Sequence, residues 1–178
     1  MKISYPHKDN HFDDLNYGFV LKKPKSSYST RRSIYCLVFN TDGEVACVQF
    51  RKEIGTMYPF PGGGVNENES WEEGLIRELK EEVGCNVKDI QPLGSFDSYG
   101  NITGRWAQSI VCSARLDGTP GKNSPAEDYE QGSRLIWLSM DKALNIMRKM
   151  TDEPEKTRDC RSYFTLKILE NISGSIDN

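Results

Sequence analysis

The segment 61–85 constrains the fold of this chain more than any other part of the sequence. It opens on a proline and three consecutive glycines, which let the backbone approach a ligand closely and adopt conformations closed to other residues. Ser70 and Glu73 have the spacing of a capping box, so a helix is expected to begin near Trp71. Gly84 can supply the left-handed conformation that ends it. The segment therefore predicts a glycine loop followed by a helix of roughly three and a half turns.

This helix combines an apolar stripe with a cluster of carboxylates. At about 100° per residue, four apolar side chains share one stripe: Trp71, Leu75, Leu79 and Val83. Glu78, Glu81 and Glu82 fall within an arc of about 100° that borders or overlaps that stripe. Carboxylates so close repel one another, and a neighbouring buried face adds a desolvation cost. A hard divalent cation such as Mg²⁺ or Mn²⁺ relieves both penalties, and it keeps coordination sites for water and phosphate oxygens.

Residues 63–85 resemble the Nudix box, the signature of the Nudix hydrolases. The pattern is Gly-x5-Glu-x7-Arg-Glu-U-x-Glu-Glu-x-Gly-U, where U is a bulky aliphatic residue, and all seven fixed positions are met. Cys85 at the last U position is the only departure, and that position packs against the core in the family. The resemblance implies an α/β (α+β) fold, a Nudix-like α/β/α sandwich with a mixed sheet in a single domain. It also implies an enzyme that hydrolyses diphosphate linkages.

The resemblance assigns roles to the matching positions. It implies that Glu81 and Glu82 are metal ligands, and that Glu78 is either a ligand or the general base that activates water. The carbonyl of Gly62 would complete part of the metal sphere. The expected cofactor is Mg²⁺ or Mn²⁺.

Further residues support this centre by resemblance. Arg77 and Glu69 match the pair that orients the catalytic helix. The family often adds a carboxylate from a later loop, for which Glu127, Asp128 and Glu130 are the candidates, and Glu130 is taken as the ligand.

A polyanionic substrate needs local cations here, because the net charge is −3 and the pI is near 5.5. Arg31, Arg32, Arg51 and Lys52 flank the early strands and could clamp phosphate oxygens, and Arg51 is the leading candidate. Tyr58, just ahead of the glycines, is the candidate for stacking on a base. Each of these cations can equally be a surface residue, and the tyrosine can be part of the core.

The expected reaction is metal-dependent hydrolysis of a diphosphate linkage in a nucleoside diphosphate-X compound, such as a (d)NTP. The alternative is a non-catalytic nucleotide or metabolite sensor on a Nudix fold, but such proteins commonly lose box carboxylates. Isopentenyl diphosphate isomerases share the fold and use a Cys-containing strand that this sequence lacks. Signatures for ADP-ribose and dinucleoside polyphosphates are not met at Tyr99 and Gly100, so both substrates are disfavoured.

Charge, hydrophobicity and cysteine content limit which partners and which location are expected. No apolar signal core appears in residues 1–10, and no stretch approaches the roughly 20 residues that span a bilayer, so a cytoplasmic protein without a membrane partner is expected. The acidic balance gives no general attraction to nucleic acid. Five widely spaced cysteines without a CxxC pair argue against a disulfide framework or a zinc site. A homodimer is allowed by the family resemblance.

The chain is expected to divide into a loose polar arm over residues 1–16, a Nudix domain over 17–172, and a frayed tail over 173–178. The last helix of the domain is expected near 154–170, because Pro154 suits a first helical turn.

Strands are predicted from apolar runs bounded by turn residues. Residues 33–39 and 45–50 are expected to form a hairpin around an Asn-Thr-Asp-Gly turn. A second strand pair is expected around Gly100 to Gly104, and a short strand over 135–138. Ser139 can cap the helix that follows it.

Overall fold

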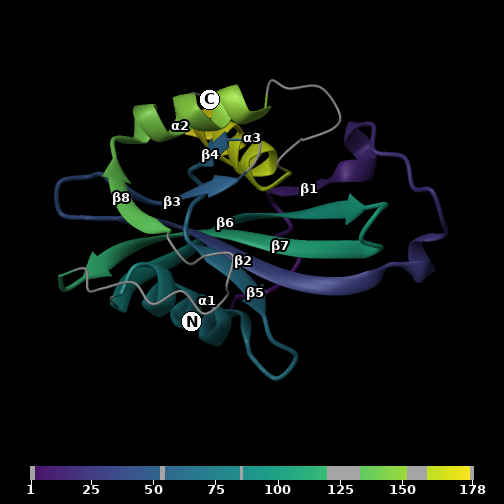
Figure 1. The fold of residues 1–178 in the computed structure, drawn as a ribbon, viewed down its shortest axis with the longest axis horizontal. Helices are drawn as coiled ribbons and strands as arrows, with labels where there is room; N and C mark the ends of the chain where they lie inside the picture. The colour runs from purple at the N-terminus through teal and green to yellow at the C-terminus, as the bar shows by residue number, and fades with distance from the viewer. Residues whose placement is uncertain (1–2, 53–54, 85, 120–132, 152–159, 177–178) are drawn as a thin grey trace.

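The computed structural model of the protein describes residues 3–52, 55–84, 86–119, 133–151 and 160–176. The strands form a mixed sheet in the spatial order β1-β6-β7-β2-β3-β4, with β5 paired to β2 and β8 paired to β3 (Figure 1). The strands are β1 (His11–Asp13), β2 (Ser29–Phe39), β3 (Val45–Lys52), β4 (Gly55–Met57), β5 (Gly62–Val65), β6 (Asn86–Gly100), β7 (Arg105–Asp117) and β8 (Arg134–Leu138). The helices are α1 (Trp71–Glu82), α2 (Met140–Thr151) and α3 (Cys160–Ile176), with short 3-10 turns η1 (Asp14–Tyr17) and η2 (Lys25–Ser27).

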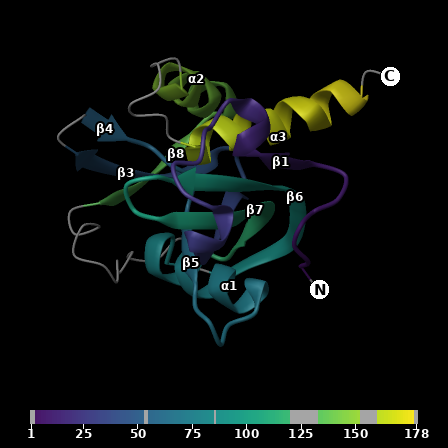
Figure 2. The same cartoon turned by 90° about the vertical axis from the view of Figure 1, so that its right-hand side faces the viewer.

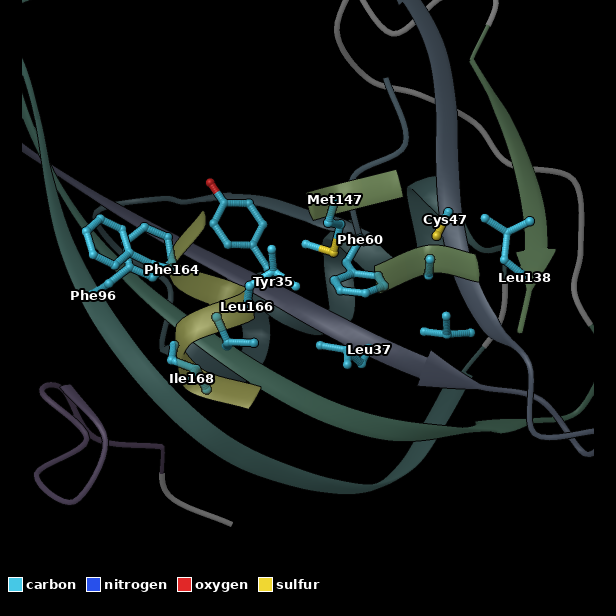
Figure 3. Packing of buried hydrophobic residues seen from close by; sticks show 13 residues of the cluster. Tyr35, Leu37, Cys47, Phe60, Phe96, Leu138, Met147, Phe164, Leu166 and Ile168 are labelled. Atoms are coloured by element: carbon cyan, nitrogen blue, oxygen red, sulfur yellow. The ribbon is translucent and has the colours of Figure 1, made fainter. Parts of the chain in front are cut away.

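The elements stack in three layers, because α1 covers one face of the sheet while α2 and α3 cover the other (Figure 1, Figure 2). Successive residues of a strand point to opposite faces, so β2 feeds both apolar layers. Ile34 packs in the cluster under α1, and Tyr35 packs with Phe96 and Phe164 in the cluster under α2 and α3 (Figure 3). The predicted α/β/α sandwich is therefore confirmed.

Strand β2 lies at the centre of this arrangement and positions the glycine segment. It runs parallel to β7 over its whole length, and residues 33–38 are buried, as the continuous apolar run predicts. On its other edge, β5 runs antiparallel to it, with Tyr35 opposite Gly62 and Arg32 opposite Val65. The glycines that the sequence predicts as a loop thus form strand β5, which pairs with the central strand β2.

The predicted hairpin of residues 33–39 and 45–50 is confirmed at its turn, where Phe39 pairs with Val45. Beyond that pair the two strands diverge, and β3 instead pairs antiparallel with β8 from Val45 to Gln49. The second predicted pair is confirmed as the β6–β7 hairpin, in which Tyr99 lies opposite Trp106.

The N-terminal residues do not form the loose arm that the polar composition predicts. Strand β1 pairs parallel with β6, and Phe12 lies opposite Phe96. Ile3 is only 4% exposed and joins the apolar cluster under α1. Asn10 donates hydrogen bonds to the carbonyls of Leu93 and Ile168, at 2.9 and 3.1 Å. Backbone pairing and a few anchoring side chains hold this segment, and a composition-based prediction sees neither.

The predicted frayed tail is also wrong for residues 173–176, because α3 continues to Ile176. Ile172 still packs against the apolar cluster, which keeps this end of the helix on the sheet. Phe164 and Ile168 on this helix are fully buried. The predicted start at Pro154 lies outside the described residues.

Two further expectations concern membranes and cysteines. In the described ranges, no helix is both long and apolar enough to cross a membrane. Cys36, Cys47 and Cys112 are buried free thiols, as expected. Burial raises the pKa of both Cys47 and Cys112 to about 12, so these thiols stay protonated at neutral pH.

Candidate active site

Helix α1 begins and ends where local sequence spacing predicts. The Ser70 Oγ accepts the Glu73 amide at 3.2 Å, and the Glu73 carboxylate accepts the Ser70 amide at 2.8 Å, which completes the capping box. Gly84, at φ 73°, lies just past the helix, and its amide donates to the Leu79 carbonyl at 3.1 Å. These contacts fix the span of the helix that carries the glutamates.

The buried stripe of α1 sets how the helix sits on the sheet. Leu75, Leu79 and Val83 are at most 1% exposed and pack in the cluster with β2. Gly74 lies directly over Val65, because a Cβ at residue 74 would come within 2.9 Å of the Val65 side chain. The helix therefore lies close against β5, and its glutamates face the glycines.

Glu82, the last residue of α1, lies against Gly62 at the start of β5. The amide of Gly62 donates to Glu82 Oε2 at 2.6 Å, and Glu82 is 7% exposed. Gly62 has φ 130°, and a Cβ there would lie 2.1 Å from the carbonyl oxygen of Ile34. Only glycine allows this approach, so the first residue of β5 both pairs with β2 and positions a carboxylate.

Glu78, also on α1, lies against Gly63, the next residue of this strand. It is 8% exposed, and a Cβ at Gly63 would come within 2.6 Å of its Oε2. Arg77 Nη1 donates to Glu78 Oε1 at 2.8 Å and lies 3.5 Å from Glu81 Oε2. One guanidinium thus offsets the repulsion between two of the three clustered carboxylates.

The structure brings Arg77 and Glu69 together as a two-point ion pair. Nε and Nη2 of Arg77 lie 2.7 and 3.0 Å from the two carboxylate oxygens, and Nη2 also donates to the Gly64 carbonyl at 2.7 Å. The amide of Asn66 donates to Glu69 Oε2 at 2.9 Å. The Arg77 hydrogen bonds and this amide lower the pKa of Glu69 to about 2. That the pair orients the catalytic helix stays a prediction.

Arg32 contributes a contact that the sequence analysis misses. Its Nη2 donates to the backbone carbonyls of Asn66, Glu67 and Glu69, the loop between β5 and α1. Its guanidinium also lies 5.5 Å from the ring centre of Trp71, the first residue of α1. The contact depends on the pairing of β2 with β5, which no local pattern indicates.

Several predicted site residues are not brought together by the described structure. Tyr58 is half-buried, and its hydroxyl accepts the Gln49 side-chain amide at 2.8 Å. Arg51 lies in β3 opposite Thr56, and its side chain lies outside the description. The late-loop candidates lie outside the described residues as well: Glu127, Asp128 and Glu130. The substrate and metal roles given to all of these residues stay predictions.

The donor chemistry of the site fits a hard divalent cation. Glu78 and Glu82 are buried carboxylates one helical turn apart. Glu81 lies on the same turn, with Oε2 3.5 Å from Arg77 Nη1. Oxygen donors of this kind suit Mg²⁺ and Mn²⁺. Within the described ranges, no three acidic, histidine or cysteine side chains converge on one point.

Comparison with known proteins shows the family. The model of the NUDIX domain matches residues 29–160, so this chain belongs to the NUDIX domain family. The match contains the capped helix, the glycine strand and β2, and it leaves out the N-terminal segment up to residue 28.

Individual relatives and structures agree with this membership. An RNA pyrophosphohydrolase of Sulfurovum sp. (strain NBC37-1) is 35% identical over 78 residues, which are 42% of this chain and 47% of that protein. An RNA pyrophosphohydrolase of Pasteurella multocida is 39% identical over 64 residues, 35% of this chain and 31% of the relative. The chain thus spans less than half the length of these relatives. A NUDIX hydrolase structure from Nitrosomonas europaea shares the fold, with a TM-score of 0.61 at 14% identity, covering 83% of this chain and 90% of that one.

Proposed function

We propose that the protein hydrolyses a diphosphate linkage in a nucleoside diphosphate-X compound, with Mg²⁺ or Mn²⁺ as cofactor. The observation that carries the proposal is the seating of Glu78 and Glu82 against Gly63 and Gly62, beside Glu81. Buried carboxylates are costly unless they are paired or used, and they cluster at catalytic sites. Family membership and relatives named RNA pyrophosphohydrolase support the same reaction class.

The proposal gives different residues the roles of metal ligand and general base. Glu81, Glu82 and the Gly62 carbonyl would hold the cation, with a late-loop carboxylate, for which Glu130 is our candidate. A bound divalent cation supplies neutralisation of the diphosphate and a lower pKa for bound water. Glu78 would accept the proton of the attacking water, whose oxygen bonds to one phosphorus as the bond to the bridging oxygen breaks. A positioned base of this kind contributes roughly 10²–10⁴-fold.

The substrate panel follows from the resemblance and from the relatives. A (d)NTP is our leading substrate, and the relatives named RNA pyrophosphohydrolase add 5′-triphosphate RNA to the compounds to be tested. A non-catalytic sensor is the alternative, but all three box glutamates and their glycine partners are present here. A cytoplasmic location and a homodimer belong to the same proposal, and the homodimer rests on the family resemblance alone.

The test is phosphate and pyrophosphate release with magnesium across (d)NTPs, nucleotide sugars, ADP-ribose, dinucleoside polyphosphates and 5′-triphosphate RNA. Glu81→Gln and Glu82→Gln should each lower turnover at least 10²-fold while leaving the far-ultraviolet circular dichroism unchanged, because each keeps its size and loses its charge. Glu67→Gln is the matched control, since its exposed side chain lies outside the site. Wild-type activity in either site variant, or activity without a divalent metal, would contradict the proposal.

A further inference from the structure

A small charged pocket lies beside the glycine strand. It has a volume of about 200 Å³ and is lined by Arg31, Arg32, Arg77 and Glu78, together with residues 64–66. Of the described residues that line it, Val65 alone is apolar. The pocket is therefore suited to a small polar group and not to a nucleobase, which needs an apolar or aromatic wall.

The three guanidinium groups differ in what they already bind. Arg77 is engaged by Glu69, by Glu78 and by the Gly64 carbonyl. Arg32 donates to the loop carbonyls that precede α1. In contrast, Arg31 is exposed, and its guanidinium has no hydrogen bond or ion pair with any residue that the structure describes.

The position of Arg31 is defined by a glycine. A Cβ at Gly64 would lie 3.1 Å from Arg31 Nη2, so the guanidinium rests against the backbone of β5 where no side chain intervenes. Gly63, the preceding residue of this strand, borders the carboxylate of Glu78. Arg31, whose guanidinium has no partner among the described residues, and Glu78, the group that would activate water, line the same pocket.

We propose that Arg31 binds a terminal phosphoryl group of the substrate and so selects compounds that end in a phosphate monoester, such as 5′-triphosphates. This inference rests on the proposed diphosphate hydrolysis. A guanidinium forms paired, charge-assisted hydrogen bonds with phosphate oxygens. The chain carries a net charge of −3, so an anionic substrate needs such a local cation close to the glutamates. A group esterified to a sugar has one fewer charge and more bulk, and it fits this pocket less well.

The experiment compares Arg31→Gln with Arg115→Gln. Arg115 is an exposed arginine near the end of β7, in register with Lys88 and Phe39, at the end of β2 away from the glycine strand. Both variants remove the same charge from an exposed position, so a general electrostatic effect would appear equally in both. Steady-state kinetics are measured on a nucleoside triphosphate and on a nucleotide sugar. Binding of a methylene-bridged ATP analogue with magnesium is measured by isothermal titration calorimetry.

Arg31→Gln is expected to lower kcat/KM for the triphosphate about 10-fold or more, mainly through KM, and to weaken binding of the analogue to a similar degree. The nucleotide sugar should change less than about twofold, and Arg115→Gln should resemble wild type on both compounds. Equal losses on both compounds, equal effects of the two variants, or a wild type that prefers the nucleotide sugar would each overturn the inference. A wild type inactive on every compound would refute the proposed function instead. The calorimetry would still show whether Arg31→Gln weakens binding of the ATP analogue.

Discussion

Gly62 and Gly63 are neighbours in β5, but an added side chain would meet a different obstacle at each position. At Gly62 an added Cβ would meet the backbone carbonyl of Ile34 at 2.1 Å, and neither partner can move without disturbing the sheet. At Gly63 the same addition would meet the carboxylate end of Glu78, at 2.6 Å. That side chain can rotate away, so the cost falls on the position of the carboxylate and not on the fold.

Gly63→Ala should therefore lower kcat by about 10-fold or more while changing the free energy of unfolding by less than about 1 kcal/mol, because it displaces the carboxylate that we propose accepts the proton of the attacking water. Gly62→Ala should destabilise the protein by about 1–3 kcal/mol through its positive φ and its backbone clash. Urea denaturation and turnover of the two variants separate these effects. Unchanged kcat in Gly63→Ala would show that the carboxylate of Glu78 does not need its place against the glycine.

At the scale of elements, the β5–loop–α1 unit is closed by the ion pair of Glu69 and Arg77. The pKa of Glu69 falls from its ordinary value of 4.5 to about 2 because Arg77 and the Asn66 amide bind its ionised form. Since the folded state prefers the carboxylate, this stabilisation is fully present above about pH 4.5 and is lost as the pH falls toward 2.

Glu69→Gln should lower the free energy of unfolding by about 1 kcal/mol at pH 7, the upper end for an exposed ion pair. The gap between variant and wild type should narrow as the pH falls below about 4.5. Denaturation curves at intervals from pH 7 to pH 3 measure it, with Glu67→Gln as the control that should track wild type throughout. A gap that stays constant down to pH 3 would mean that the stabilisation does not come from the charge of Glu69.

Elements whose determinants are local could be predicted from the sequence. The capping box of Ser70 and Glu73 and the stop at Gly84 use contacts within five residues, so their spacing is visible in the sequence. Strand β5 was predicted as a loop, because glycine is normally disfavoured in strands. Its pairing with β2 is a long-range event, and the contacts of Arg32 with the loop before α1 follow from that pairing alone.

At the scale of the whole molecule, the sandwich was predictable through the resemblance, whereas the N-terminal segment was not. Residues up to 28 lie outside the family match, yet they reach both the sheet edge and helix α1. The Ile3 amide donates to Glu72, and the ring of Tyr5 stacks on Trp71 at 5.8 Å. Polar composition over residues 1–16 conceals these anchors, because two or three side chains make the contacts.

Tyr5 links the first turn of α1 to strand β6 of the sheet, since its hydroxyl also donates to the buried carboxylate of Asp97 on that strand. Burial and this contact raise the pKa of Tyr5, so the hydroxyl keeps its proton at neutral pH. Tyr5→Ala removes both contacts and should lower the free energy of unfolding by about 2–3 kcal/mol. Tyr5→Phe keeps the stacking and should lose about 1–2 kcal/mol, because Asp97 is left with one donor fewer.

Amide hydrogen exchange places this effect in the molecule. Because the tyrosine holds the start of α1, Tyr5→Ala should speed exchange in the first turns of that helix, over residues 73–76, more than in β7. The exposed Lys8→Ala in the same segment is the control and should leave both regions unchanged. Uniformly faster exchange across α1 and β7 would show that Tyr5 contributes only to global stability. Faster exchange confined to the first turns of α1 would show that the N-terminal segment, which lies outside the NUDIX domain match, stabilises the start of this helix.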